Sequence, residues 1–135
     1  MVVEAKQYLL DTTACIAVIR GKLSVIGKIK SVGLKNCKVS EISIAELYYG
    51  ASKSGQEKLF DDVKTILQMF KVIPVFPSLP TYGEVKAHLE TIGQRIDDMD
   101  LLIGSTALHN NMTLVTHNIK HLSRLPNVDI QDWEM

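Results

Sequence analysis

Three acidic residues lie next to predicted turns from a strand to a helix, and they are the residues whose types and places best suit metal chemistry. Asp11 ends the apolar run over residues 8–10. Glu46 lies just inside a helix that follows the strand-like residues 37–40, and Asp100 lies at the opening of another helix. If the fold brings these carboxylates together, they form an oxygen-rich cage for a hard divalent cation, and such cages often cleave phosphodiester bonds.

The electrostatics of such a cluster favour a bound cation. Two carboxylates about 4 Å apart repel each other by roughly 4 kcal/mol at an effective dielectric constant of 20. Three of them raise one another's pKa values and do not all stay ionised without a cation. The sequence has no cysteine pair or His-x-x-x-His spacing beside these acids. We therefore expect Asp11, Glu46 and Asp100 to bind Mg²⁺ or Mn²⁺ rather than zinc.

Each acid also has an alternative interpretation as a helix cap. Ser43 and Glu46 match a capping box, in which Glu46 only bonds back to a backbone N–H. Asp97 or Asp98 could be a helix N-cap, and Asp11 could cap the helix after the first strand. Capping is the commoner use of any one such residue, but the acids share one expected edge of the sheet. Their joint placement favours a site.

The elements that must position these acids alternate along the chain. Strands are predicted over 7–10, 37–40, 72–76, 112–116 and 128–130, and helices over 14–20, 23–29, 43–51, 56–70, 80–93, 98–109 and 118–122. This order predicts a three-layer α/β/α sandwich in one domain over residues 1–135, with a mainly parallel central sheet of about five strands. Pro74 predicts an edge position for the third strand.

In open α/β sheets, ligands bind outside the carboxyl ends of the strands, where the strand order reverses. Asp11 ends the first predicted strand, and residues 116–118 end the fourth. The sequence therefore predicts that these two segments flank a site.

Composition excludes several classes of protein. The 135 residues are 46% hydrophobic and 22% charged, with no net charge, which is typical of a globular protein. No apolar stretch approaches the roughly 20 residues of a membrane span, and an N-terminus that carries Glu4 lacks the apolar core of a signal peptide. Cys15 and Cys37 lie in apolar runs and are expected to be core residues in a reducing cytoplasm.

Basic residues concentrate near the N-terminal third of the chain. Residues 12–40 contain no acid and six basic residues, namely Arg20, Lys22, Lys28, Lys30, Lys35 and Lys38. This segment is either a phosphate-facing surface or an ordinary solvated pair of helices.

Four motifs occur in an order and spacing that resemble a known family. They are Leu-Leu-Asp-Thr-Thr at 9–13, Ser-x-Ile-Ser-Ile-Ala-Glu-Leu-Tyr-Tyr-Gly at 40–50, Ile-Asp-Asp-Met-Asp-Leu-Leu-Ile-Gly-Ser-Thr-Ala at 96–107 and Leu-Val-Thr-His-Asn-Ile-Lys-His-Leu at 114–122. The sequence resembles the PIN-domain nucleases, and within them the VapC-type toxins of bacterial and archaeal toxin–antitoxin pairs. The resemblance extends from residue 8 to residue 133.

The resemblance implies an endoribonuclease that depends on Mg²⁺ or Mn²⁺, acts on RNA, forms a homodimer and is neutralised by a cognate antitoxin. By motif match, Asp11, Glu46 and Asp100 are the metal-binding acids, and Asp97 takes the position of a further catalytic acid. Asp98 is less favoured than Asp97 for this catalytic position, because it should point in a different direction from the helix.

The same resemblance assigns substrate-binding roles at the carboxyl end of the fourth strand. Thr116 and Asn118 match a Thr-x-Asn pair, in which Asn118 orients a metal-bound group or the phosphate. Thr13 stands where many members have asparagine, and its hydroxyl can still bind a carboxylate or phosphate. His121 stands where members often carry a fourth acid, and it either contacts phosphate or lies on the surface.

Other functions stay open at this point. Because His121 stands in place of a fourth acid, the chain could alternatively be a catalytically weak or silent PIN-like module that binds RNA or a partner. A receiver-like phosphoacceptor is disfavoured because residues 116–118 lack the lysine that it needs. His88, His109 and His117 show no ligand spacing. Apolar residues for a dimer or antitoxin surface, or alternatively for the core, are Leu47, Tyr48, Tyr49, Leu59 and Phe60.

Overall fold

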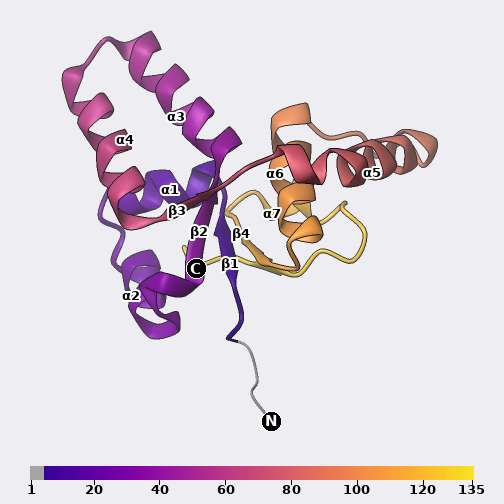
Figure 1. The fold of residues 1–135 in the computed structure, drawn as a ribbon, viewed down its shortest axis with the longest axis horizontal. Helices are drawn as coiled ribbons and strands as arrows, with labels where there is room; N and C mark the ends of the chain where they lie inside the picture. The colour runs from indigo at the N-terminus through magenta and orange to yellow at the C-terminus, as the bar shows by residue number, and fades with distance from the viewer. Residues whose placement is uncertain (1–4) are drawn as a thin grey trace.

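The structure, a computed structural model, describes residues 5–135 (Figure 1). Glu4, on which the export prediction depends, lies outside these residues. The strands are β1 (Tyr8–Leu10), β2 (Cys37–Ser40), β3 (Lys71–Ile73), β4 (Thr113–Val115) and β5 (Ile130–Gln131). The helices are α1 (Thr12–Ile19), α2 (Leu23–Val32), α3 (Glu41–Ser54), α4 (Glu57–Met69), α5 (Leu79–Thr91), α6 (Asp98–His109) and α7 (Ile119–Leu122), with 3₁₀ turns at Leu34–Asn36 and Phe76–Ser78.

The five strands form one sheet in the order β3-β2-β1-β4-β5, and all four pairings are parallel. The prediction of a mainly parallel sheet is therefore confirmed. β3 is an edge strand, as Pro74 predicted, but it ends at Ile73 rather than at residue 76. Proline has no N–H to donate to a neighbouring strand, and the chain after it turns into the 3₁₀ segment at 76–78.

Alternate residues of β1 pack into two separate cores, one on each face of the sheet, and this arrangement gives three layers. Tyr8 and Leu10 pack with residues of α1, α2, α3 and α4 on one face of the sheet. Leu9 is fully buried on the other face with residues of α5, α6 and α7. Figure 1 shows α3 and α4 on one side of the sheet and α5 and α6 on the other. Period-two alternation on a strand buried on both faces is what the three-layer prediction requires.

The strand order reverses between β1 and β4. From β1 the chain moves through β2 to the edge strand β3, and then returns to place β4 on the other side of β1. The backbone N–H of Asp11 donates to the carbonyl of Val115 at 3.0 Å, so the carboxyl ends of these two strands are held side by side. This is the switch point at which a ligand site is expected.

No helix within residues 5–135 combines the length and the apolar character that crossing a membrane requires.

Candidate functional site

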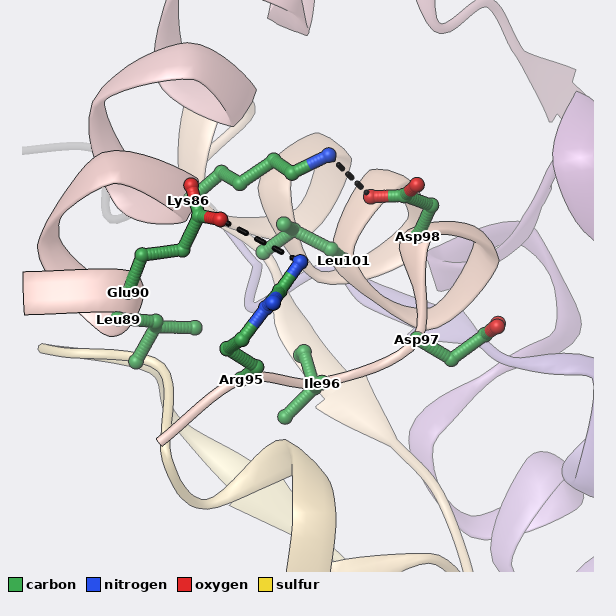
Figure 2. Close-up of a pocket in the computed structure, with 8 residues that line it drawn as sticks. All are labelled: Lys86, Leu89, Glu90, Arg95, Ile96, Asp97, Asp98 and Leu101. Atoms are coloured by element: carbon green, nitrogen blue, oxygen red, sulfur yellow. Dashed lines mark hydrogen bonds and ion pairs between the residues drawn. The ribbon is translucent and has the colours of Figure 1, made fainter. Parts of the chain in front are cut away.

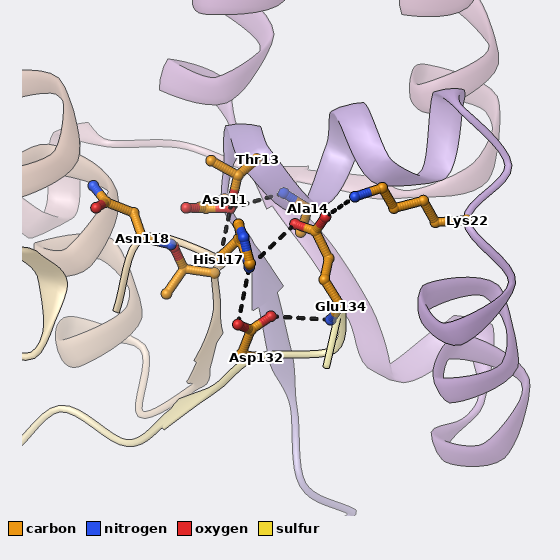
Figure 3. Close-up of polar contacts among 9 residues, drawn as sticks. Asp11, Thr13, Ala14, Lys22, His117, Asn118, Asp132 and Glu134 are labelled. Atoms are coloured by element: carbon orange, nitrogen blue, oxygen red, sulfur yellow. Dashed lines mark hydrogen bonds and ion pairs between the residues drawn. The ribbon is translucent and has the colours of Figure 1, made fainter. Parts of the chain in front are cut away.

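Asp11 lies at the centre of the switch point and is also the N-cap of α1. It is only 2% exposed, and its Oδ1 accepts hydrogen bonds from the Ala14 N–H at 2.9 Å and from the Thr13 hydroxyl at 2.6 Å (Figure 3). Burial raises the pKa of this carboxyl, while hydrogen bonds from Thr116 and Thr13 oppose the rise. Asp11 can therefore be both the N-cap of α1 and a residue of the site, because the capping bond fixes the direction of its carboxylate.

Glu46 does not cap its helix, and the capping box over Ser43 and Glu46 is wrong. α3 begins at Glu41 because Ser40, the last residue of β2, is the N-cap, and its hydroxyl accepts the N–H of Ile42 at 3.0 Å. The Ser43 hydroxyl is buried and has no hydrogen-bond partner within residues 5–135. The helix therefore starts earlier than predicted, and the Glu46 carboxylate is free for other partners.

The partner of Glu46 is a residue that the sequence interpretation missed. The Thr12 hydroxyl donates to Glu46 Oε1 at 2.5 Å, across 34 positions of sequence. This contact connects the first turn of α1 to α3. The two adjacent threonines after Asp11 were the only feature of the sequence that pointed to this hydrogen bond, and a threonine at the start of a helix is more often a cap.

Asp97 and Asp98 point in different directions from the start of α6. Asp97 is the N-cap, and its Oδ2 accepts the N–H of Met99 at 3.1 Å. Asp98 accepts from the Lys86 ammonium at 2.9 Å and from the Tyr82 hydroxyl at 3.0 Å, and these hydrogen bonds, Lys86 first, lower its pKa. Figure 2 shows Asp98 directed at Lys86 and Asp97 directed away from that pair.

The pKa of Asp100 is raised by burial and by the charges of three other acids. Its pKa is raised to about 6, first by burial and then by the charges of Glu46, Asp97 and Asp11, in that order. Charges act over short distances in water, so Asp11, Glu46 and Asp97 lie within electrostatic range of Asp100. Within residues 5–135, however, the carboxylate oxygens of these acids do not all approach within 4.8 Å of one another. Asp98 is held apart by Lys86 and Tyr82. The roles of Asp11, Glu46, Asp97 and Asp100 in binding and catalysis stay predictions.

The residues that follow β4 close the other side of this acidic cleft. The Asn118 side-chain amide donates to Asp100 Oδ2 at 3.3 Å, and its carbonyl oxygen lies 3.0 Å from His121 Nδ1. The Thr116 hydroxyl accepts the N–H of Asn118 at 2.9 Å. Asn118 is thus held through its backbone N–H by Thr116 and through its side chain by His121. His121, which is exposed, touches the site through Asn118, and its charge lowers the pKa of Asp100.

Thr13 joins the first and fourth strands at the cleft. Its hydroxyl donates to Asp11 and accepts the backbone N–H of His117 at 3.0 Å. Its hydroxyl therefore bonds to a carboxylate, which is one of the two roles that the sequence predicted for it.

A hollow extends from Glu46 between α1, α3 and α4. Its volume is about 350 Å³, and it is lined by residues that include Thr12, Ile16, Arg20, Glu46, Leu47 and Val63. Leu47 is buried, whereas Tyr48 and Tyr49 on α3 are 43% and 67% exposed. The predicted apolar surface is thus divided between core and solvent.

The basic segment near the N-terminus is largely exposed. Arg20, Lys22, Lys28, Lys30 and Lys35 lie at the surface. Lys38 is half-buried and bonds to the Gln7 side chain, and Lys22 pairs with Glu134. Four of the six basic residues therefore present charge to solvent with no ion pair within residues 5–135.

Comparisons with known proteins agree with this geometry. Residues 8–127 match the PIN domain family. The chain is 35% identical to Ribonuclease VapC2 of Rickettsia felis and 27% identical to the tRNA(fMet)-specific endonuclease VapC of Salmonella typhimurium, in each case over 94% of this chain and 98% of the relative. The crystal structure of VapBC2 from Rickettsia felis bound to a promoter DNA fragment contains a similar chain, with a TM-score of 0.87 and 35% identity over 93% of this chain and 98% of that one.

Proposed function

The chain belongs to the PIN-domain family, and we propose that it is a VapC-type endoribonuclease, the toxin of a toxin–antitoxin pair, which hydrolyses phosphodiester bonds in RNA. One observation carries the catalytic part of this proposal. At the switch point of the sheet, the charges of Glu46, Asp97 and Asp11 act on Asp100 and, after burial, contribute to its raised pKa. Relatives named as ribonucleases over nearly the full length support the same activity.

The donor set of the cleft fits a hard divalent cation. Asp11, Glu46 and Asp100 offer oxygen atoms alone, which suits Mg²⁺ or Mn²⁺. Their charges also fit, because a cation would offset the repulsion that contributes to the raised pKa of Asp100. When bound, such an ion supplies Lewis-acid stabilisation of the phosphate charge and acidifies a water molecule.

The residues around the cleft have separate tasks in this proposal. The capped geometry of Asp11 fixes its carboxylate, and Thr12 fixes that of Glu46. Asn118 orients Asp100 through its amide, and Thr116 in turn holds the backbone N–H of Asn118. Asp97 is near enough to contribute to the raised pKa of Asp100, and in this proposal it accepts a proton from an attacking water.

Helix α2 and the turn that contains Lys35 lie toward the amino ends of the strands, at the opposite end of the sheet from the cleft (Figure 1), and their exposed lysines would hold a more distant part of the RNA backbone. Lys28 and Lys30 on α2 and Lys35 after it carry charge into solvent, and neutralising phosphates with such residues gives salt-dependent binding. The partner antitoxin would place apolar residues in the hollow between α1, α3 and α4, whose lining is mainly apolar. A basic residue of that partner would suit the acidic cleft that adjoins this hollow at Glu46. Exposed Tyr48 and Tyr49 are suited to a protein contact, either with the antitoxin or in a homodimer.

A cleavage assay tests the proposed function. Purified chain, free of antitoxin, is incubated with structured RNA in Mg²⁺, and parallel reactions contain excess EDTA. We expect RNA fragments in Mg²⁺ and none in EDTA, with activity restored by Mn²⁺. Binding of RNA without cleavage in either ion would instead favour the silent binding module.

Replacement of Thr12 by valine tests the support of Glu46. Thr12→Val removes the donor to Glu46 at nearly constant volume, and a hydrogen bond to a charged group is worth about 1.5–3 kcal/mol. We expect the cleavage rate to fall about tenfold or more at unchanged fold. Thr65→Val, at an exposed position of α4, is the matched control. Equal rates in wild type and Thr12→Val would show that this hydroxyl is not needed.

The raised pKa of Asp100 predicts how cation binding depends on pH. Below about pH 6 this carboxyl holds a proton that the cation must displace, so the apparent affinity for Mn²⁺ should rise about tenfold per pH unit up to that value and flatten above it. Calorimetric titrations between about pH 5 and about pH 8 measure the slope. A flat profile across this range would contradict the assignment.

A further inference from the structure

We propose that His117, Asp132 and Glu134 form a second divalent-cation site, suited to zinc, beside the acidic cleft. His117 follows β4, and the two acids follow β5 at the C-terminal end of the chain. One ligand atom from each of the three residues lies within 4.8 Å of the other two. Figure 3 shows the three side chains converging next to Thr13, on the side away from Asn118. This site goes beyond the proposed nuclease function and does not rest on it.

The separations between the ligand atoms suit a small ion. His117 Nδ1 lies 2.9 Å from Asp132 Oδ2 and 3.8 Å from Glu134 Oε2. Ligand atoms at about 2.0–2.1 Å from a tetrahedral zinc ion are roughly 3.3 Å apart. The two observed separations bracket this value, and the third, between the oxygen atoms of Asp132 and Glu134, is no more than 4.8 Å.

Each carboxylate is already oriented by a second contact. Asp132 Oδ1 accepts the backbone N–H of Glu134 at 2.9 Å, and Glu134 Oε1 pairs with the Lys22 ammonium. The remaining oxygen of each acid faces His117 Nδ1. Contacts of this kind fix the direction of metal ligands and raise affinity in known sites.

The charge balance leaves room for a cation. The side chains of Asp132 and Glu134 are only 9% and 10% exposed, and Lys22 is the one lysine or arginine paired with them within residues 5–135. With a neutral imidazole the group carries one net negative charge, which is costly at this degree of burial. A divalent ion bound at His117 Nδ1 would offset this charge and leave the group with one net positive charge.

An ion and its water ligand have access to the site. The His117 side chain is 59% exposed, and a hollow of about 280 Å³ lined in part by Thr13, Lys22, His117 and Glu134 opens beside it. Three protein ligands and one water are the usual set of an open zinc site.

The two sites should select different ions. An imidazole with two carboxylates favours zinc, whereas the all-oxygen cleft of Asp11, Glu46 and Asp100 favours Mg²⁺ or Mn²⁺. They are joined by one short path, from the His117 backbone N–H to the Thr13 hydroxyl and on to Asp11. Zinc would therefore tie the C-terminal residues to the turn that borders the cleft.

Zinc titration of the untagged full chain tests this site. Calorimetry is performed in saturating Mg²⁺, which occupies the cleft. We expect one zinc ion per chain, with affinity lowered at least about tenfold in His117→Gln and in Asp132→Asn. His88→Gln, at an exposed position of α5, is the matched control and should bind as wild type does. Circular dichroism checks that each variant is folded.

Two further measurements keep this proposal separate from the nuclease proposal. A chain with Asp11→Asn and Asp100→Asn should still bind zinc, and nuclear magnetic resonance should show one of the four histidine rings shifting on zinc addition, a ring absent from His117→Gln. The proposal is overturned if wild type binds no zinc. Zinc binding that survives His117→Gln but is lost in the double variant also overturns it.

Discussion

Asp11→Asn is expected to lower RNA cleavage by at least about a thousandfold while the chain stays folded. The substitution removes the negative charge at the centre of the cleft, which a divalent cation needs as a ligand. It keeps an oxygen that can still accept the Ala14 N–H, so the cap of α1 survives. Initial rates on a structured RNA, measured beside thermal denaturation, test both halves of this expectation.

Asp11→Ala is the control that separates the two tasks of this residue. It should abolish cleavage equally, and in addition destabilise the chain by about 0.5–2 kcal/mol because the cap of α1 is lost. Cleavage by Asp11→Asn at the wild-type rate would remove Asp11 from the site. Unfolding of both variants would instead show that the residue is chiefly structural.

Asp100→Asn is expected to abolish cleavage and, at the same time, to stabilise the metal-free chain. Asp100 has a pKa of about 6, above its ordinary value of 3.8, because of burial and the charges of Glu46, Asp97 and Asp11. Its ionised form therefore opposes folding. For a half-buried group, screening by solvent reduces the effect to on the order of 1 kcal/mol. Asparagine removes this repulsion and keeps an oxygen for the Asn118 amide.

The sign of this gain depends on pH in a defined way. A carboxyl whose folded pKa is raised is protonated in both states below about pH 4, so the variant gains nothing there. Between about pH 4 and about pH 6 the wild type loses stability as the pH rises, and above that the gain of the variant is constant. Urea denaturation in EDTA across this range measures the difference. Equal stability of the two chains at neutral pH would show that the acids do not repel one another.

The sequence was sufficient for the architecture because the signals are local. Strands that alternate with helices predicted the parallel sheet, and Pro74 predicted the edge strand. The error at the start of α3 also has a local cause. Ser40 and Ser43 are both suited to be N-caps, and the capping-box pattern at 43–46 favoured Ser43. In the structure Ser40, which ends β2, caps the helix.

Contacts between distant segments could not be predicted from one sequence. Thr12 meets Glu46 across 34 positions, and no periodicity or spacing marks such a pair. His117 showed no ligand spacing because its partners, Asp132 and Glu134, lie 15 and 17 positions later in the chain, after β5. The acids of the cleft were found because each stands at the end of a strand or the start of a helix, where the parallel sheet itself brings them to one edge.

The most direct test of the cation cleft is a crystal of this chain soaked in Mn²⁺ and measured for anomalous scattering. The proposed site predicts a peak bordered by the carboxylates of Asp11 and Asp100, with Glu46 nearby, and no such peak in Asp100→Asn. A peak that lies only elsewhere, or carboxylates of Asp11, Glu46 and Asp100 that face separate regions of solvent, would contradict it.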